Sequence, residues 1–304
     1  MTTPAPSHLP VLIGPIREIA AAAGARRVVD GTLGHGGHAE MFLGQGAEVL
    51  GIDRDPEALG IARARLGEGL RTLEAPYASE EALAEVERFA PDFILLDLGV
   101  SSRQLDDDAR GFTFRPGASL DMRMGREGPT GADILNEYDD ESLSDIFHAW
   151  GDERKARPLA REVVRRRGNA PFTTSDDFVN AIRKVLGPRS GPGDFARLFQ
   201  ALRIAVNDEL AGLETALPAF LESLQKGGHL AVISYHSGED RVAKHLFQEW
   251  ARACICPPSQ PFCTCRGAPL GTLVPRKPIL PDAAEIAANP RARSAKLRIF
   301  RKAE

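Results

Sequence analysis

The sequence has no long hydrophobic run. No stretch of 18 apolar residues occurs in the 304-residue chain, so no membrane-spanning helix is predicted. Residues 1–10 are polar and rich in proline, without the apolar segment that a signal peptide requires. We therefore expect a cytoplasmic protein that has no membrane partner.

Cysteine is scarce and confined to one segment. All four cysteines lie between Cys254 and Cys265, as two C-x-C pairs separated by six residues. Secreted disulfide proteins spread their cysteines along the chain, so this grouping is unlike theirs. Structural zinc sites typically use C-x-x-C pairs. The spacing therefore favours free thiols or a labile disulfide over zinc, and no metal site is predicted.

Neither sign of charge dominates the chain, which has a net charge of -4. The two signs are nevertheless separated along the sequence. Residues 104–151 contain 11 acidic and 4 basic residues, whereas residues 152–203 contain 12 basic and 6 acidic ones. A basic block in a slightly acidic protein indicates a localised site for a polyanion.

A glycine-rich turn between two predicted strands dominates the N-terminal third. Residues 28–30 form a short apolar strand that ends in Asp30, and residues 31–38 contain four glycines. A second strand at residues 49–52 ends in Asp53, which is placed to accept hydrogen bonds from ribose hydroxyls. The spacing from Asp30 is D-x-x-x-G-x-G, which fits S-adenosyl-L-methionine better than the G-x-G-x-x-G turn of dinucleotide sites. A glycine turn of any doubly wound protein is the alternative.

The alternation of strands and helices continues to residue 98. Weakly apolar residues 70–75 and strongly apolar residues 93–98 flank a helical pattern at 80–89, which predicts a parallel, doubly wound α/β sheet. Ligands bind beyond the carboxyl ends of such strands. This places Tyr77 either against an adenine ring or in a surface loop. It also makes Asp97 a candidate, because a carboxylate that ends an apolar strand is costly without partners.

An inserted helical domain is expected in the middle of the chain. After a loop-like stretch at 106–124, residues 141–150, 152–167 and 174–186 have helical patterns. We assign residues 109–198 to this insert, and residues 1–108 and 199–304 to the Rossmann-like domain. Four arginines gather at one helix end and are either a solvated face or, as we favour, contacts to RNA phosphates. They are Arg161, Arg165, Arg166 and Arg167.

The flanking segments complete the predicted sheet domain. Residues 10–23 form an N-terminal helix, and residues 198–224 form one long helix. A strand at 229–236 ends in polar residues on the ligand side of the sheet. Alternating charged and apolar residues at 296–301 predict a final edge strand.

Nine segments together resemble the bacterial family of 16S ribosomal RNA cytosine-N(4) methyltransferases, known as RsmH or MraW. The matching segments are HLPVL at 8–12, DGTLGHGGH at 30–38, GIDRDP at 51–56, LLDLGVSS at 95–102, RGF at 110–112, LDMRM at 120–124, FQALRI at 199–204, VNDEL at 206–210 and NPRARS at 289–294. The resemblance runs nearly end to end. Departures occur at Arg103, Tyr235 and Gly238, where the family usually has Pro, Phe and Leu, and at residues 191–198.

The resemblance implies methyl transfer from S-adenosyl-L-methionine to the exocyclic amine of one cytosine in the decoding region of 16S rRNA in the small ribosomal subunit. The residues that the resemblance and the glycine turn assign to the cofactor are Gly34, Gly36, Gly37, His38, Asp53, Tyr77, Asp97 and Gln104.

The chemistry of a cytosine amine narrows the roles further. Its lone pair is delocalised, so catalysis must align it with the methyl donor and accept a proton. Asp97 or His236 could take that proton, and Phe112, Phe114 or Tyr235 could stack on the base, which must be unpaired or flipped out. Rival readings are a methyltransferase acting on DNA or a small molecule, and an RNA-binding assembly factor without turnover. The oligomeric state is open, with a homodimer among the alternatives.

Overall fold

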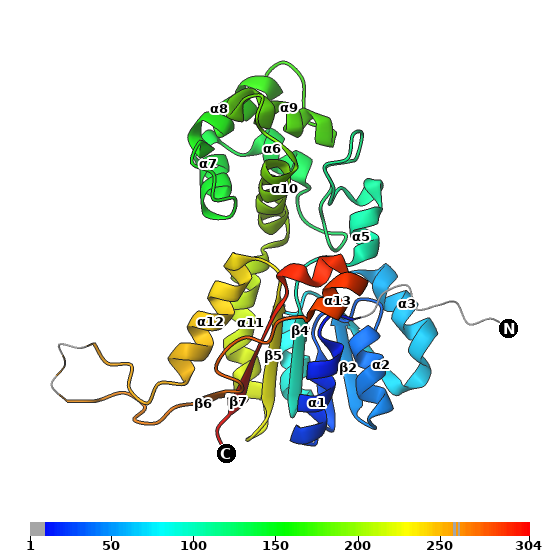
Figure 1. Cartoon of the computed structure of the whole chain (residues 1–304), viewed down its shortest axis with the longest axis vertical. Helices are drawn as coiled ribbons and strands as arrows, with labels where there is room; N and C mark the ends of the chain where they lie inside the picture. Colours follow the sequence, from blue (N-terminus) through cyan, green and yellow to red (C-terminus); the bar gives the residue numbers. More distant parts are fainter. Residues whose placement is uncertain (1–9, 258–259, 261) are drawn as a thin grey trace. The chain divides into compact units, whose positions relative to one another are not determined.

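The computed structural model describes residues 10–257, 260 and 262–304, and it divides the chain into two compact units (Figure 1). The sheet unit comprises the chain up to Gly99 together with Leu210–Glu304, and the helical unit is Val100–Glu209. The predicted insert, residues 109–198, lies within the helical unit. The first two residues of the HLPVL segment fall outside the described residues.

A mixed sheet of seven described strands forms the sheet unit, in the order β3-β2-β1-β4-β5-β7-β6. Five strands are parallel, and β7 is antiparallel to both of its neighbours. The strands are β1 Arg27–Asp30, β2 Glu48–Asp53, β3 Leu70–Glu74, β4 Phe93–Asp97, β5 His229–Ser234, β6 Gly271–Leu273 and β7 Lys296–Lys302. The predicted doubly wound α/β sheet is confirmed.

Helices cover both faces of this sheet. They are α1 Ile13–Ala23, α2 Gly37–Gly44, α3 Pro56–Leu66, α4 Glu80–Phe89, α11 Glu209–Ser223, α12 Ser237–Trp250 and α13 Ala283–Ala288, with short 3-10 turns at Gly67–Gly69 and Pro290–Ser294. Side chains alternate across β4: Phe93 and Leu95 join the core under α1, α2 and α3, whereas Ile94 and Leu96 join the core under α4, α11 and α12. This period of two, apolar on both faces, is what a buried central strand requires.

The strand register brings three aspartates to one edge of the sheet. Asp30 pairs with Gly51 on β2, Asp53 pairs with Glu74 on β3, and Asp97 pairs with Ile233 on β5. These strands are parallel, so their carboxyl ends share an edge. Three carboxylates from distant parts of the sequence therefore meet at the edge where ligands bind.

Two expectations about the second half are wrong. The strand at 296–301 is β7, but it lies between β5 and β6 and is not an edge. The three-residue β6 is too short to give a sequence pattern. The single helix at 198–224 is instead α10 Pro192–Asn207 and α11, separated by Asp208 at φ +50°. Aspartate tolerates this left-handed conformation better than most residues.

The helical unit has its own core. Its helices are α5 Ser102–Asp106, a 3-10 turn at Asp108–Arg110, α6 Gly131–Glu137, α7 Asp140–Ala149, α8 Ala156–Arg167, α9 Ser175–Leu186 and α10. Side chains of Thr130 and Asp139 cap the starts of α6 and α7, and the Asp177 carboxylate accepts from the Thr174 N–H at the start of α9. Helix α8 begins later than the predicted 152, because Asp152 adopts a left-handed conformation at φ +47°.

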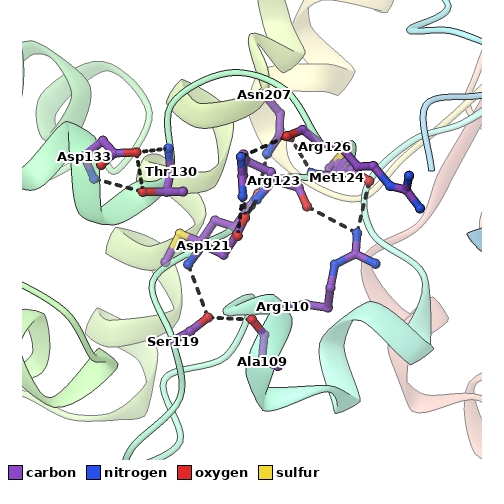
Figure 2. Close-up of polar contacts among 11 residues, drawn as sticks. Ala109, Arg110, Ser119, Asp121, Arg123, Met124, Arg126, Thr130, Asp133 and Asn207 are labelled. Atoms are coloured by element: carbon purple, nitrogen blue, oxygen red, sulfur yellow. Dashed lines mark hydrogen bonds and ion pairs between the residues drawn. The ribbon is translucent and has the colours of Figure 1, made fainter. Parts of the chain in front are cut away.

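Side-chain hydrogen bonds order the loop before α6 (Figure 2). Arg123 forms a two-bond ion pair with Asp121, both at 2.8 Å, and Arg110 donates to the carbonyl oxygens of Arg123 and Met124. Asn207 accepts from the Met124 N–H at 2.9 Å. The LDMRM and VNDEL segments therefore lie together within this unit.

Within the described part of the chain, no helix is long and apolar enough to cross a membrane.

Candidate active site

The glycine turn after β1 is shaped by backbone conformations that favour glycine. Gly34 and Gly36 have φ values of +51° and +78°. The Gly34 N–H donates to Asp53 Oδ2 at 2.7 Å, which links the turn to the end of β2. A Cβ on Gly37 would lie 2.5 Å from Pro10 Cγ. Gly34 and Gly36 therefore favour glycine for their backbone conformation, and Gly37 favours it for lack of space.

Asp53 closes β2 with both carboxylate oxygens engaged. Oδ1 accepts from the Asp55 N–H at 2.9 Å, and Oδ2 accepts from Gly34. Burial raises the pKa of Asp53, and the two N–H donors partly offset this effect. Each carboxylate oxygen can accept more than one hydrogen bond, so the group can also receive ribose hydroxyls.

Asp97 lies between a phenol and an imidazole. The Tyr235 hydroxyl donates to Asp97 Oδ1 at 2.7 Å, and His38 Nδ1 lies 3.7 Å from Asp97 Oδ2. The Asp97 N–H donates to Thr32 Oγ1 at 2.6 Å, so the glycine turn also fixes its backbone. The carboxylate side chain remains 23% exposed. It is thus held in place and still accessible to a reacting group.

The surroundings of Asp97 shift its pKa in opposite directions. Burial raises the pKa of Asp97, while the positive charge that His38 can carry and the hydrogen bond from Tyr235 lower it. Burial and the neighbouring carboxylate raise the pKa of Tyr235. The phenol therefore stays protonated and acts only as a donor to Asp97.

The contacts of His38 assign its tautomer. Its Nε2 lies 3.0 Å from the Val11 carbonyl oxygen, which can only accept, so Nε2 carries a hydrogen. Nδ1 is consequently the ring nitrogen that faces Asp97 and can hold a second proton there. The buried His38 therefore lies beside the carboxylate as a positioned basic group.

Comparison with known proteins now identifies the family. The sequence profile of the MraW methylase family matches residues 5–303. The chain belongs to the MraW methylase family. A relative from Gemmatimonas aurantiaca, named ribosomal RNA small subunit methyltransferase H, is 55% identical over 97% of this chain and 95% of its own length. A relative of the same name from Heliobacterium mobile is 42% identical over 97% of this chain and 98% of its own.

Solved structures are similar only at a distance. An rRNA methylase from Streptococcus thermophilus aligns with 98% of this chain and 100% of its own, at 13% identity and a TM-score of 0.40. The family is therefore identified by the family match and the sequence relatives, not by this distant structural likeness.

S-adenosyl-L-methionine is the methyl donor that membership of a methylase family implies, and the residues present fit it. Gly34, Gly36 and Gly37 add no side chain of their own to the turn, and Asp53 supplies a carboxylate at the ribose position. The Tyr77 ring, the candidate for adenine, packs 6.5 Å from the Phe220 ring, measured between centroids.

Gln104, the remaining cofactor candidate, belongs to the helical unit. Its Oε1 accepts from the Ser101 N–H at 2.9 Å, and its own N–H donates to Ser101 Oγ at 3.2 Å. This capping box starts α5. The structure thus explains Gln104 as a helix cap, and its contact with the cofactor stays a prediction.

His236 acts as the N-cap of α12 in this MraW-family fold. Its Nδ1 accepts from the N–H groups of Gly238 and Glu239 at 3.2 and 3.4 Å. Its Nε2 lies 3.1 Å from Glu239 Oε1. Because Nδ1 accepts from two backbone N–H groups at the start of α12, a helix-capping role explains His236 better than proton transfer does. Asp97 is therefore the stronger candidate for the proton acceptor.

Sequence reasoning missed two buried carboxylates in the same unit. Asp30 is 1% exposed, and burial raises its pKa to about 7, with further contributions from Asp97 and Asp53. Glu239 Oε2 accepts from the N–H groups of Tyr235 and His236 at 2.8 and 3.2 Å. Asp30 could have been found, because it ends an apolar strand as Asp97 does. Glu239 gave no such signal.

Two of the predicted stacking residues, Phe112 and Phe114, lie in the helical unit, whereas Tyr235 lies in the sheet unit, where its hydroxyl donates to Asp97. Phe112 is only 8% exposed and belongs to the core of the helical unit. This burial argues against Phe112 as a base-stacking residue. Phe114 is half-buried and makes edge contacts with Phe195 and Phe199, at 5.9 and 6.0 Å between centroids. Phe114 remains the better candidate of the two.

The four arginines of α8 have different surroundings. Arg161 and Arg165 are exposed, but Arg165 forms a two-bond ion pair with Glu162 at 2.8 Å. Arg166 also donates to Glu162. Arg167 donates to the carbonyl oxygens of Leu135 and Tyr138 at the end of α6. The cluster is therefore partly neutralised, and one member has a structural role.

Proposed function

We propose that this chain transfers the methyl group of S-adenosyl-L-methionine to the N4 amine of a specific cytosine in the decoding region of 16S rRNA. Membership of the MraW methylase family and the names of its relatives, which are small-subunit rRNA methyltransferases, support the substrate. The observation that carries the chemistry is Asp97, a carboxylate fixed by Tyr235 and His38 at the ligand edge of the sheet.

The cofactor supplies an electrophilic methyl group when it is bound. The glycine turn and Asp53 would hold its nucleoside, with Tyr77 as the candidate for the adenine ring. The strand-end carboxylates have raised pKa values, which means that their negative charges are poorly compensated. A cation bound at this edge would stabilise those charges. A sulfonium bears a positive charge.

In this proposal, Asp97 orients the amine and accepts its proton. Its carboxylate accepts a hydrogen bond from an amine N–H, which orients the nitrogen lone pair. As positive charge develops on the nitrogen, the carboxylate stabilises it and accepts the proton. Tyr235 keeps Oδ1 occupied, so Oδ2 is the oxygen that faces His38 Nδ1 and the reacting group.

RNA recognition in this proposal rests on the helical unit. The exposed Arg161 and Arg165 supply phosphate contacts, and Arg166 contributes through its partly exposed guanidinium. Phe114 offers an aromatic edge for stacking. The target cytosine has to leave its base stack to reach a strand-end carboxylate.

Transfer of radiolabelled methyl from S-adenosyl-L-methionine to small subunits, 16S rRNA and DNA tests the proposal. Nucleoside mass spectrometry and mapping of the labelled fragment identify the base. N4-methylcytidine in the decoding region is expected with wild type and with Asp145→Asn, an exposed carboxylate control. Label in DNA, or on another atom or region, would overturn the substrate, and no label on any of these would favour an assembly factor.

A further inference from the structure

Four cysteine sulfurs converge in the segment between α12 and β6. The Sγ atoms of Cys254, Cys256, Cys263 and Cys265 all lie within 4.8 Å of one another. Cys263 and Cys265 are 3.4 Å apart, and Cys256 and Cys263 are 4.0 Å apart, both measured between sulfurs. The proposed methyl transfer uses none of these residues.

We propose that this cluster binds one Zn²⁺ ion through four thiolates. With zinc–sulfur bonds of ~2.3 Å, the sulfurs of a tetrahedral site lie ~3.8 Å apart, and the Cys263–Cys265 and Cys256–Cys263 distances fall on either side of this value. A disulfide would bring two sulfurs to ~2 Å. An iron–sulfur cluster spreads its four cysteines over several irons, so their sulfurs would be farther apart.

The surrounding chain offers little else to hold these sulfurs together. Between α12 and β6 the described residues form no helix or strand, and none of them is buried (Figure 1). Even Phe262 is 80% exposed. Apolar burial therefore cannot order this segment, and short stretches without a core are typically ordered by a metal or by disulfides. A zinc ion would supply that cross-link.

The local hydrogen bonds are consistent with bound thiolates. The Ile255 N–H points at Cys265 Sγ at 3.4 Å, as backbone donors do around metal-bound sulfur. Arg266 donates to the carbonyl oxygens of Glu249 and Arg252, which ties the second C-x-C pair to the end of α12. A zinc ion with four thiolates has a charge of -2, and Arg252 and Arg266 flank the cysteines along the chain.

The sequence favoured free thiols, because C-x-C pairs are atypical of structural zinc. The fold alters that inference, since the two pairs approach each other across the intervening residues. Each pair needs to supply only one edge of a tetrahedron, and Cys263 and Cys265 already span such an edge. The proposal therefore departs from the sequence-based expectation that no metal is bound.

Metal content of the full-length protein tests the site. The protein is purified without an affinity metal, and zinc and iron are measured by plasma mass spectrometry. Wild type is expected to hold about one zinc per chain. Cys263→Ser and Cys256→Ser should each lower bound zinc severalfold. Gln260→Ala changes the same segment without removing a thiol, so it should retain wild-type zinc.

Cobalt substitution provides a readout that is independent of activity. Co²⁺ bound by four thiolates gives an intense visible absorption that Zn²⁺ removes on titration, and Cys263→Ser should lose it. Wild type that holds no zinc after anaerobic reconstitution, that holds iron instead, or whose zinc survives both serine substitutions would overturn the proposal. Thiol counting that shows disulfides in the freshly purified protein would do so as well.

Discussion

The aspartates of the sheet unit and the arginines of the helical unit present two contrasting groups of charge. Asp30, Asp53 and Asp97 come from separated stretches of sequence, yet they meet at one edge of the sheet with raised pKa values. The arginines are close neighbours in the sequence, yet they have divergent partners. Arg165 contacts Glu162, whereas Arg167 contacts backbone carbonyls.

In the proposed function, a position at the end of a strand therefore marks a candidate site residue better than clustering along the sequence does. A strand-end carboxylate is placed by the sheet, and a buried carboxylate with a raised pKa is a candidate for a functional group. A basic run along a helix presents its side chains in several directions, so some are consumed by structure. The predictions below test this contrast.

Removing the negative charge of Asp97 should have the largest effect. Asp97→Asn keeps size and shape but cannot accept the proton, so single-turnover methyl transfer at saturating cofactor and RNA should fall by roughly 10²- to 10⁴-fold. RNA affinity should barely change. A rate within about threefold of wild type would mean that Asp97 only shapes the pocket.

Substitutions of Tyr235 and His236, which lie near Asp97, provide comparisons for the effect of Asp97→Asn. Tyr235→Phe removes the 2.7 Å hydrogen bond to Asp97 but leaves the carboxylate, so a smaller loss of rate is expected. His236→Ala removes the N-cap of α12, which should lower the free energy of unfolding by about 1 kcal/mol with little change in the chemical step. A loss of rate as large as that of Asp97→Asn would restore His236 as a proton acceptor.

Asp53 tests cofactor binding rather than chemistry. Asp53→Ala should weaken S-adenosyl-L-methionine binding by roughly tenfold or more, because hydroxyl hydrogen bonds to a charged acceptor are worth about 1.5 to 3 kcal/mol. Titration calorimetry measures this. Asp53→Asn retains an acceptor for the Gly34 N–H and separates support of the turn from charge. Unchanged affinity in both variants would remove Asp53 from the site.

The burial of Asp30 should make the folding stability depend on pH. Its pKa is raised from 3.8 to about 7 in the folded protein, so between these values the folded state binds more protons than the unfolded state. Stability should therefore fall as pH rises through this window. Asp30→Asn lacks the ionisation, and its stability relative to wild type should rise by a few kcal/mol between about pH 4 and pH 8. Denaturant unfolding of both proteins, with Asp145→Asn as control, measures this; parallel pH curves would contradict it.

The parts of the fold that the sequence predicted are those with a local pattern. Apolar runs ending in aspartate located β1, β2 and β4, and parallel pairing then implied that Asp53 and Asp97 share an edge. Asp30 follows the same rule but was treated only as the reference point for the glycine spacing. The charges of Asp53 and Asp97 also raise the pKa of Asp30, and only the strand register shows that the three carboxylates lie close together.

Other features depend on contacts between distant residues. The helix breaks at Asp208, next to Asn207, whose side chain donates to the Arg203 and Met122 carbonyl oxygens. The periodicity of apolar residues in the sequence does not predict such a contact. Phe112 lies close to Arg110 in the sequence and was a stacking candidate, but the helical core buries it. The zinc proposal likewise depends on two C-x-C pairs approaching each other, which spacing alone does not show.

The arginines of α8 provide the smallest expected effect and the sharpest test of the contrast. Arg161→Gln with Arg165→Gln should weaken RNA binding severalfold and reduce the slope of log affinity against log salt by up to ~2, since each phosphate contact contributes ~0.7 to 0.9. The ion pair with Arg165 lowers the pKa of Glu162 to about 2, so Glu162 competes with phosphate, and Arg165 should contribute less than Arg161.

Arg167→Gln is the matched control, because it also removes one positive charge from the same helix end. It leaves the Leu135 and Tyr138 carbonyl oxygens without their donor, which should cost about 1 to 3 kcal/mol of folding stability. The salt slope should change little. Fluorescence anisotropy over a salt series and denaturant unfolding separate the two effects. Equal slopes in wild type and the double variant would make α8 a solvated face, whereas a reduced slope in Arg167→Gln would show that a guanidinium bound to carbonyls can still contact phosphate.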